Sequence, residues 1–199
     1  MKICLSNATR KQLMSLEIGL LQYSYIQKYY KTNDEDFRDV FTDFYLASQG
    51  RMRKVENRVP FFELLSKTKP DDSLIDIVSK LYMTLPVGMY EFSFATKLLH
   101  TINTKSPIYD SKVYKYLKYD EKVNLWDIQQ KKVDSSGKIM TQIDKICHNW
   151  NELKNWYDSF TKTARASDWI KWFDTNFPLY KSISDIKKID FIIFTLSGY

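Results

Sequence analysis

Residues 106–117 read SPIYDSKVYKYL, and this stretch decides how the chain is interpreted. A proline-ended turn places one carboxylate, Asp110, at the start of a helix that carries lysines and tyrosines. An aspartate in this position is a good helix cap. It is also a suitable position for anion-handling or glycosidic-bond chemistry, so the sequence leaves both interpretations of Asp110 open.

Working outward from this stretch, apolar side chains recur at steps of three and four residues along most of the chain. The steps predict helices at about residues 9–31, 34–47, 61–66, 74–85, 91–102, 110–117 and 139–160, with two more beginning at 167 or 168 and at 184. Pro60 is expected in the first turn of the short helix 61–66. Only five glycines and five prolines occur, which favours long elements over a many-stranded sandwich. With no clear strand pattern, the sequence predicts an all-α fold.

The length of the chain suits one domain. At 199 residues it is expected to form a single all-α domain, 1–199. The most polar interval, residues 129–137, is the expected boundary between two lobes, 1–128 and 138–199.

Charge and cysteine content suggest the setting of the protein. A net charge of +6 is compatible with a polyanionic partner such as DNA, and equally with lysines that only keep the surface soluble. Two cysteines are too few for a disulfide framework and favour a reduced, cytoplasmic location. No segment approaches the roughly 20 apolar residues of a membrane span, so no membrane association is expected. The oligomeric state is left open.

The sequence lacks the residue patterns that several kinds of site require. The glycines are scattered, whereas a phosphate-binding loop needs them clustered. The only histidines are His100, which follows two leucines and is expected to be packed, and His148, whose side chain diverges from that of Cys147 on a helix. No metal and no cofactor are therefore expected.

The stretch from Ser93 to Leu117 resembles the helix-hairpin-helix DNA glycosylase superfamily, most closely its adenine-removing mismatch branch. In that branch a Leu-Pro-Gly-x-Gly hairpin leads into a helix reading roughly Ser-Thr-Ala, and a Pro-Ile-x-Asp-Gly-x-Val-x-Arg segment follows. Here residues 93–95 read SFA and residues 107–115 read PIYDSKVYK, at nearly the family separation. The resemblance covers about 30 residues strongly. It implies two helical lobes around a shared cleft and a role in DNA repair.

The resemblance also implies roles for individual residues. Asp110 would stabilise the oxocarbenium-like sugar as the N-glycosidic bond breaks, or would activate water. Ser93 aligns with the lysine that attacks the sugar in the lyase branch, which implies hydrolysis without strand cleavage. Lys97, one turn further on the same face, is either a displaced nucleophile or a solvated helix lysine.

The chain departs from the family pattern in three places. Residues 85–91 read LPVGMYE and keep Leu-Pro and one glycine, Gly88, so phosphate binding by this hairpin is in doubt. The four iron–sulfur cysteines are absent, and the second carboxylate of the adenine branch is not assignable within residues 34–43. The candidate DNA-contacting residues, besides the basic cluster at residues 51–58, are Gly88, Lys105, Tyr109, Lys112, Lys115 and Lys118.

Two functions follow. The first is a DNA-binding protein that acts as a monofunctional N-glycosidic hydrolase on damaged or mispaired bases. The second is a catalytically inactive helical interaction protein that keeps the glycosylase-like fold. The second hypothesis predicts that no cleft lies beside Asp110.

Overall fold

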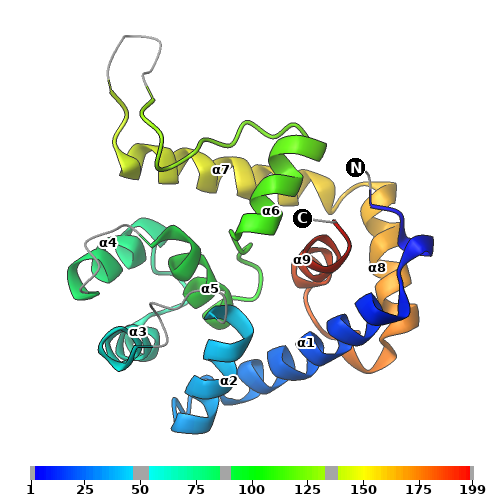
Figure 1. Ribbon diagram of the computed structural model, residues 1–199, viewed down its shortest axis with the longest axis horizontal. Coiled ribbons are helices and arrows are strands. Elements are labelled where there is room, and N and C mark those ends of the chain that lie inside the picture. The colour runs from blue at the N-terminus through cyan, green and yellow to red at the C-terminus, as the bar shows by residue number, and fades with distance from the viewer. Residues whose placement is uncertain (1–2, 47–53, 86–90, 133–138, 198–199) are drawn as a thin grey trace.

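The computed structural model describes residues 3–46, 54–85, 91–132 and 139–197, and within these ranges it contains helices and no strand (Figure 1). The α-helices are α1 (Arg10–Tyr29), α2 (Glu35–Leu46), α3 (Val55–Lys67), α4 (Leu74–Thr84), α5 (Phe92–Ile102), α6 (Ser111–Lys115), α7 (Gln142–Phe160), α8 (Ala164–Asn176) and α9 (Asp185–Leu196). A π-helical turn, η3 (Tyr116–Asp120), continues α6, and the short 3₁₀ helices η1 (Leu5–Asn7) and η4 (Pro178–Tyr180) complete the set. The all-α prediction is confirmed. Within the described ranges, no helix combines the length and the apolar content that a membrane span requires.

Local capping explains where several helices begin. Ser73 accepts a hydrogen bond from the backbone N–H of Asp76 at the start of α4, and Ser184 accepts one from Lys187 at the start of α9. Both starts agree with the sequence prediction. A cap of this kind satisfies one of the backbone N–H groups that a helix start leaves without a partner.

Three predicted helix starts are wrong, and one of them is that of α7, which begins at Gln142 and not near residue 139. The short helix expected at 61–66 is the longer α3, with Pro60 inside it rather than in its first turn. The interior position is tolerated here because Phe61 and Phe62, which follow the proline, are fully buried, and this burial offsets the missing hydrogen bond. Helix α8 begins before residue 167, because Thr163 caps it by accepting from the N–H of Ala166.

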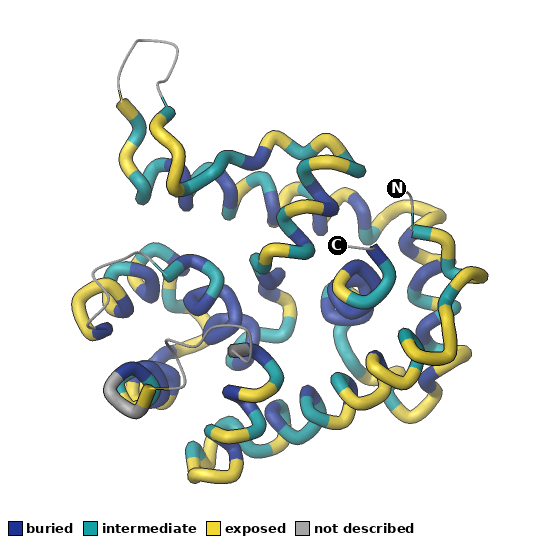
Figure 2. The backbone as a smooth tube through the Cα atoms, in the orientation of Figure 1, coloured by how far each residue is buried: buried dark blue, intermediate teal, exposed yellow. Residues whose placement is uncertain are grey.

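The buried apolar side chains form two clusters, which we call the α2–α5 cluster and the α9 cluster. The first gathers side chains of α2, α3, α4 and α5, and the second gathers α1, α6, α7 and α8 around α9. In Figure 1 helix α9 is surrounded by α1, α6 and α8, and Figure 2 shows the buried sides of these helices turned inward. Helix α1 joins the clusters, since Ile26 belongs to the first and Leu20 to the second. The predicted lobe boundary at 129–137 remains a prediction, and most of that segment lies outside the described residues.

Candidate functional site

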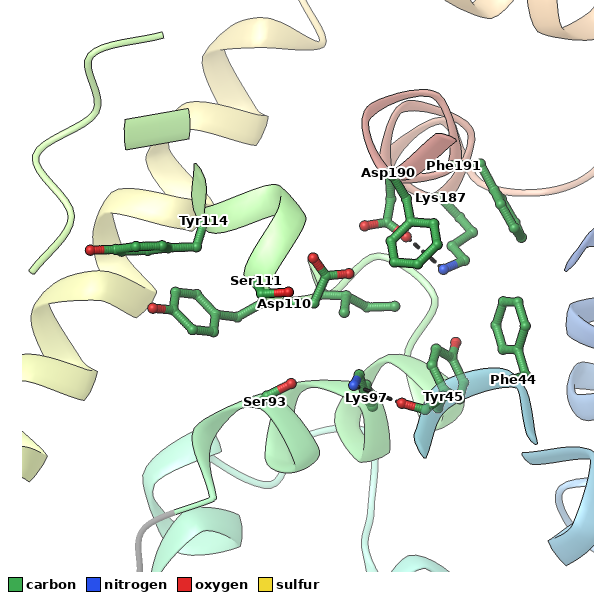
Figure 3. Close-up of a pocket in the computed structure, with 13 residues that line it drawn as sticks. Phe44, Tyr45, Ser93, Lys97, Asp110, Ser111, Tyr114, Lys187, Asp190 and Phe191 are labelled. Atoms are coloured by element: carbon green, nitrogen blue, oxygen red, sulfur yellow. Dashed lines mark hydrogen bonds and ion pairs between the residues drawn. The ribbon is translucent and has the colours of Figure 1, made fainter. Parts of the chain in front are cut away.

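A cavity of about 490 Å³ lies where the two clusters meet (Figure 3). Helices α2, α5, α6 and α9 and the segment before α6 all contribute to its wall. Its lining side chains are Phe44, Tyr45, Ser93, Lys97, Ile108, Tyr109, Asp110, Ser111, Tyr114, Lys187, Asp190, Phe191 and Phe194. The three residues predicted as catalytic, Asp110, Ser93 and Lys97, are all among them.

Asp110 caps α6 and also faces the cavity. Its Oδ1 accepts hydrogen bonds from the backbone N–H groups of Lys112 and Val113, each at 2.8 Å. Among the described residues, no protein group donates a hydrogen bond to Oδ2. The carboxylate is therefore fixed by one oxygen, and the cap leaves the other oxygen available to the cavity.

Two hydrogen-bonded contacts hold the segment before Asp110 against α5. The backbone N–H of Tyr109 donates to Oγ1 of Thr96 at 3.1 Å. Nδ1 of His100 contacts the carbonyl oxygen of Ser106 at 2.6 Å, and Nε2 contacts the hydroxyl of Tyr23 at 3.0 Å. Because a carbonyl oxygen only accepts, Nδ1 carries the proton and Nε2 accepts from Tyr23. His100 is packed, as the sequence predicted, and it positions the segment that carries Asp110.

Stability is expected to fall on acidification because of His100. Burial, and secondarily the charge of Lys187, lowers the pKa of His100 from 6.5 to about 3. His100 therefore becomes protonated near pH 6.5 in the unfolded chain, but only near pH 3 in the folded chain. Between pH 6.5 and 5 this costs about 2 kcal/mol of unfolding free energy.

The measurement is denaturant unfolding of the parent and of His100→Gln at several pH values. Other groups titrate in both proteins, so the difference in slope isolates His100. Equal slopes would contradict the assignment of a buried neutral imidazole.

Ser93 and Lys97 lie one turn apart on α5 and face the cavity together, as the spacing predicted. The expectation of a solvated lysine is wrong, because Lys97 is only 6% exposed. Its Nζ donates at 2.8 Å to the carbonyl oxygen of Tyr45, near the C-terminal end of α2. Such carbonyl groups lack a partner within their own helix, so a cation is favourable there. Burial lowers the pKa of Lys97, and the charge of Asp110 partly opposes this shift.

Helix α9 contributes a charged pair that the sequence analysis missed. Nζ of Lys187 lies 2.6 Å from Oδ2 of Asp190, and both side chains are almost completely buried. Oδ1 of Asp190 is also buried and has no hydrogen-bond partner among the described residues. Burial raises the pKa of Asp190, an effect that Lys187 opposes and Asp110 reinforces. The available signal was two opposite charges three residues apart, directly before the apolar run of the terminal helix.

Most of the predicted DNA-contacting residues lie outside the cavity. Lys105 and Lys115 are exposed. Lys112 donates to the carbonyl oxygen of Phe194 at 3.0 Å, and Lys118 donates to the hydroxyl of Tyr114 at 2.5 Å. Of the five candidates that the structure describes, only Tyr109 lines the cavity.

The described residues offer no grouping of three His, Cys, Asp or Glu side chains that would hold a metal ion. Within the cavity the two carboxylates are Asp110 and Asp190. Each already accepts hydrogen bonds at one oxygen: Asp110 accepts from backbone N–H groups, and Asp190 accepts from the ammonium group of Lys187. The arrangement suits a ligand that carries positive charge or donates hydrogen bonds.

Gly88 and most of the hairpin 85–91 lie outside the described residues, as do residues 51–53 of the basic cluster. No acidic residue of the described segment 34–43 lines this cavity. The second carboxylate of the cavity, Asp190, comes from α9 instead. Comparison of the chain with models of protein families, with characterised proteins and with solved structures found no match.

Proposed function

We propose that this chain binds DNA and hydrolyses the N-glycosidic bond of a damaged or mispaired base, using a helix-hairpin-helix glycosylase-like fold. One observation carries the proposal: a carboxylate fixed at a helix start, Asp110, opens into a cavity with aromatic walls. A volume of about 490 Å³ is within the range of small-molecule sites. Enzymes that act on a base extrude it from the helix into such a pocket, where aromatic side chains pack against it.

Asp110 supplies the chemistry in this proposal. Cleavage of the bond develops positive charge on the sugar, and a carboxylate beside it lowers the barrier. Oδ2 of Asp110 is the oxygen available for this contact, since Oδ1 is occupied by Lys112 and Val113.

Two side chains of α5, Ser93 and Lys97, favour hydrolysis without strand cleavage. Ser93 stands where the lyase branch of the family has its nucleophile, and a hydroxyl does not form a Schiff base. The amine of Lys97 is directed to the carbonyl of Tyr45. Strand cleavage at the base-free site, with a covalent adduct trapped by borohydride, would instead assign Lys97 as a nucleophile.

The first test is whether the protein releases bases and binds DNA in a salt-dependent manner. Purified protein is incubated with duplexes that contain a mispaired adenine or an alkylated purine, and released bases are measured by chromatography. Binding is measured on DNA that carries a tetrahydrofuran abasic mimic. If Lys105 and Lys115 each contact a phosphate, affinity falls about tenfold between about 50 and 200 mM salt.

The matched variants for binding are the double substitution of Lys105 and Lys115 by alanine, and Lys162→Ala as an exposed lysine control. The first is expected to reduce the salt dependence and the second to leave it unchanged. No base release from any duplex, together with salt-independent binding, would overturn the proposed function.

A second candidate function is the inactive interaction protein. It is favoured by the exposed apolar face of α1, where Met14, Ile18 and Leu21 are each more than half exposed. Its prediction that no cleft lies beside Asp110 is not met, because the cavity lies there. Under this hypothesis Asp110 only caps α6, and its removal changes stability without changing any activity.

A further inference from the structure

Two carboxyl groups enter one cavity from opposite sides. Asp110 comes from the start of α6, and Asp190 comes from α9, about 80 residues later in the sequence. Figure 3 shows their carboxyl groups lying toward each other across the space between the two helices. The charge of Asp110 acts on Asp190, where it contributes to the raised pKa of that carboxyl group.

Each carboxyl group has one oxygen engaged and one oxygen unused. Asp190 is held by its Oδ2, which accepts from Lys187 at 2.6 Å. Its Oδ1 is buried and has no hydrogen-bond partner among the described residues, and the residue as a whole is only 4% exposed. A buried acceptor without a donor is costly and rare in folded proteins. In a ligand-binding cavity, the expected explanation is a donor that the ligand or the solvent supplies.

The two environments suit different tasks. Asp190 forms an ion pair with Lys187, which favours its charged form, whereas burial opposes that form and makes the carboxylate more basic than an exposed one. A basic, ionised carboxylate with an unused oxygen is suited to accept a proton. Asp110 is rigidly fixed by two backbone N–H groups and is suited to face a developing cation.

We propose that Asp190 is a second catalytic carboxylate of this cavity, which accepts a proton from the attacking water while Asp110 stabilises the sugar cation. This inference rests on the proposed function and adds to it a division of labour between two helices. It assigns to the site a substrate whose cationic sugar lies between the two carboxylates.

The step balances as follows. The bond between C1′ of the sugar and the base nitrogen breaks, and its electron pair leaves with the base. The oxygen of water forms a bond to C1′, and one water proton passes to the carboxylate of Asp190. The departing base takes a proton from solvent, and Asp190 returns its own proton to solvent, so one water molecule is consumed in total.

The experiment compares single-turnover base release by the parent, Asp190→Asn, Asp190→Ala and Asp110→Asn, on the duplex that the parent uses. Both Asp190 variants are expected to be slower by about 10²–10⁴-fold, the usual contribution of a general base. Sodium azide needs no base to attack C1′. It is therefore expected to accelerate Asp190→Ala and to give a sugar azide detectable by mass spectrometry, while Asp110→Asn gains nothing.

Folding is controlled by the double substitution Lys187→Met with Asp190→Leu, which removes both charges of the buried pair. This protein is expected to fold and bind the abasic mimic but to release base as slowly as Asp190→Asn. Base release at the parental rate by Asp190→Asn or by the double variant would overturn the inference alone. Failure of azide to accelerate Asp190→Ala would also overturn it, whereas a parent that releases no base overturns the proposed function and this inference together.

Discussion

Replacing Asp110 with asparagine is expected to slow base release by about 10²–10⁴-fold while DNA binding and stability stay nearly unchanged. The asparagine side chain retains a carbonyl oxygen that accepts from Lys112 and Val113, so α6 remains capped. What it loses is the negative charge that faces the sugar. The measurement is single-turnover base release, with binding to the abasic mimic recorded in parallel.

Asp110→Ala is the matched control, because it removes both the charge and the cap. It is expected to lose base release as Asp110→Asn does, and to lose about 1 kcal/mol of unfolding free energy in addition. Unimpaired base release by Asp110→Asn would exclude Asp110 from the chemistry. An alanine variant that loses stability without any change in activity would support the interaction-protein hypothesis instead.

The features that could be predicted from the sequence are those that depend on neighbouring residues. The caps at Ser73, Asp110 and Ser184 each involve a side chain and a backbone N–H two or three residues away. The pairing of Ser93 with Lys97 follows from the helical repeat alone. Local hydrogen bonds and a fixed period therefore account for these three helix starts and for one wall of the cavity.

The burial of Lys97 could not be predicted because it depends on how helices surround α5. The reading of Lys97 as solvated assumes that one face of a helix meets solvent. Nearly every residue of α5 is buried, from Phe92 to Thr101, so this helix has no solvated face for a lysine. Its ammonium group is accommodated by the end of a different helix, α2.

The contribution of α9 to the cavity is also a matter of long-range packing. Asp190 and Asp110 meet because α9 packs inside the ring of α1, α6 and α8, and no local pattern specifies that neighbour. The charges of Lys187 and Asp190 interrupt the apolar run of the terminal helix. This pair of opposite charges inside one helix is the sequence feature that indicates a cavity.

Replacing Lys187 alone with methionine is expected to lower the free energy of unfolding by about 3–5 kcal/mol, because it leaves the carboxyl group of Asp190 buried without its cation. The ammonium group also lies within 5.5 Å of four aromatic ring centres among the described residues, so the substitution removes four cation–π contacts as well: those with Tyr23, Phe44, Tyr45 and Phe191. Replacing both partners, with Lys187→Met and Asp190→Leu, is expected to recover most of the loss, since no unpaired charge remains buried. Denaturant unfolding of the three proteins measures these differences. The loss of unfolding free energy in the single variant is expected to shrink as the pH is lowered, because protonation of Asp190 removes the uncompensated charge. A single variant as stable as the parent at neutral pH would show that solvent, and not Lys187, balances the charge of Asp190.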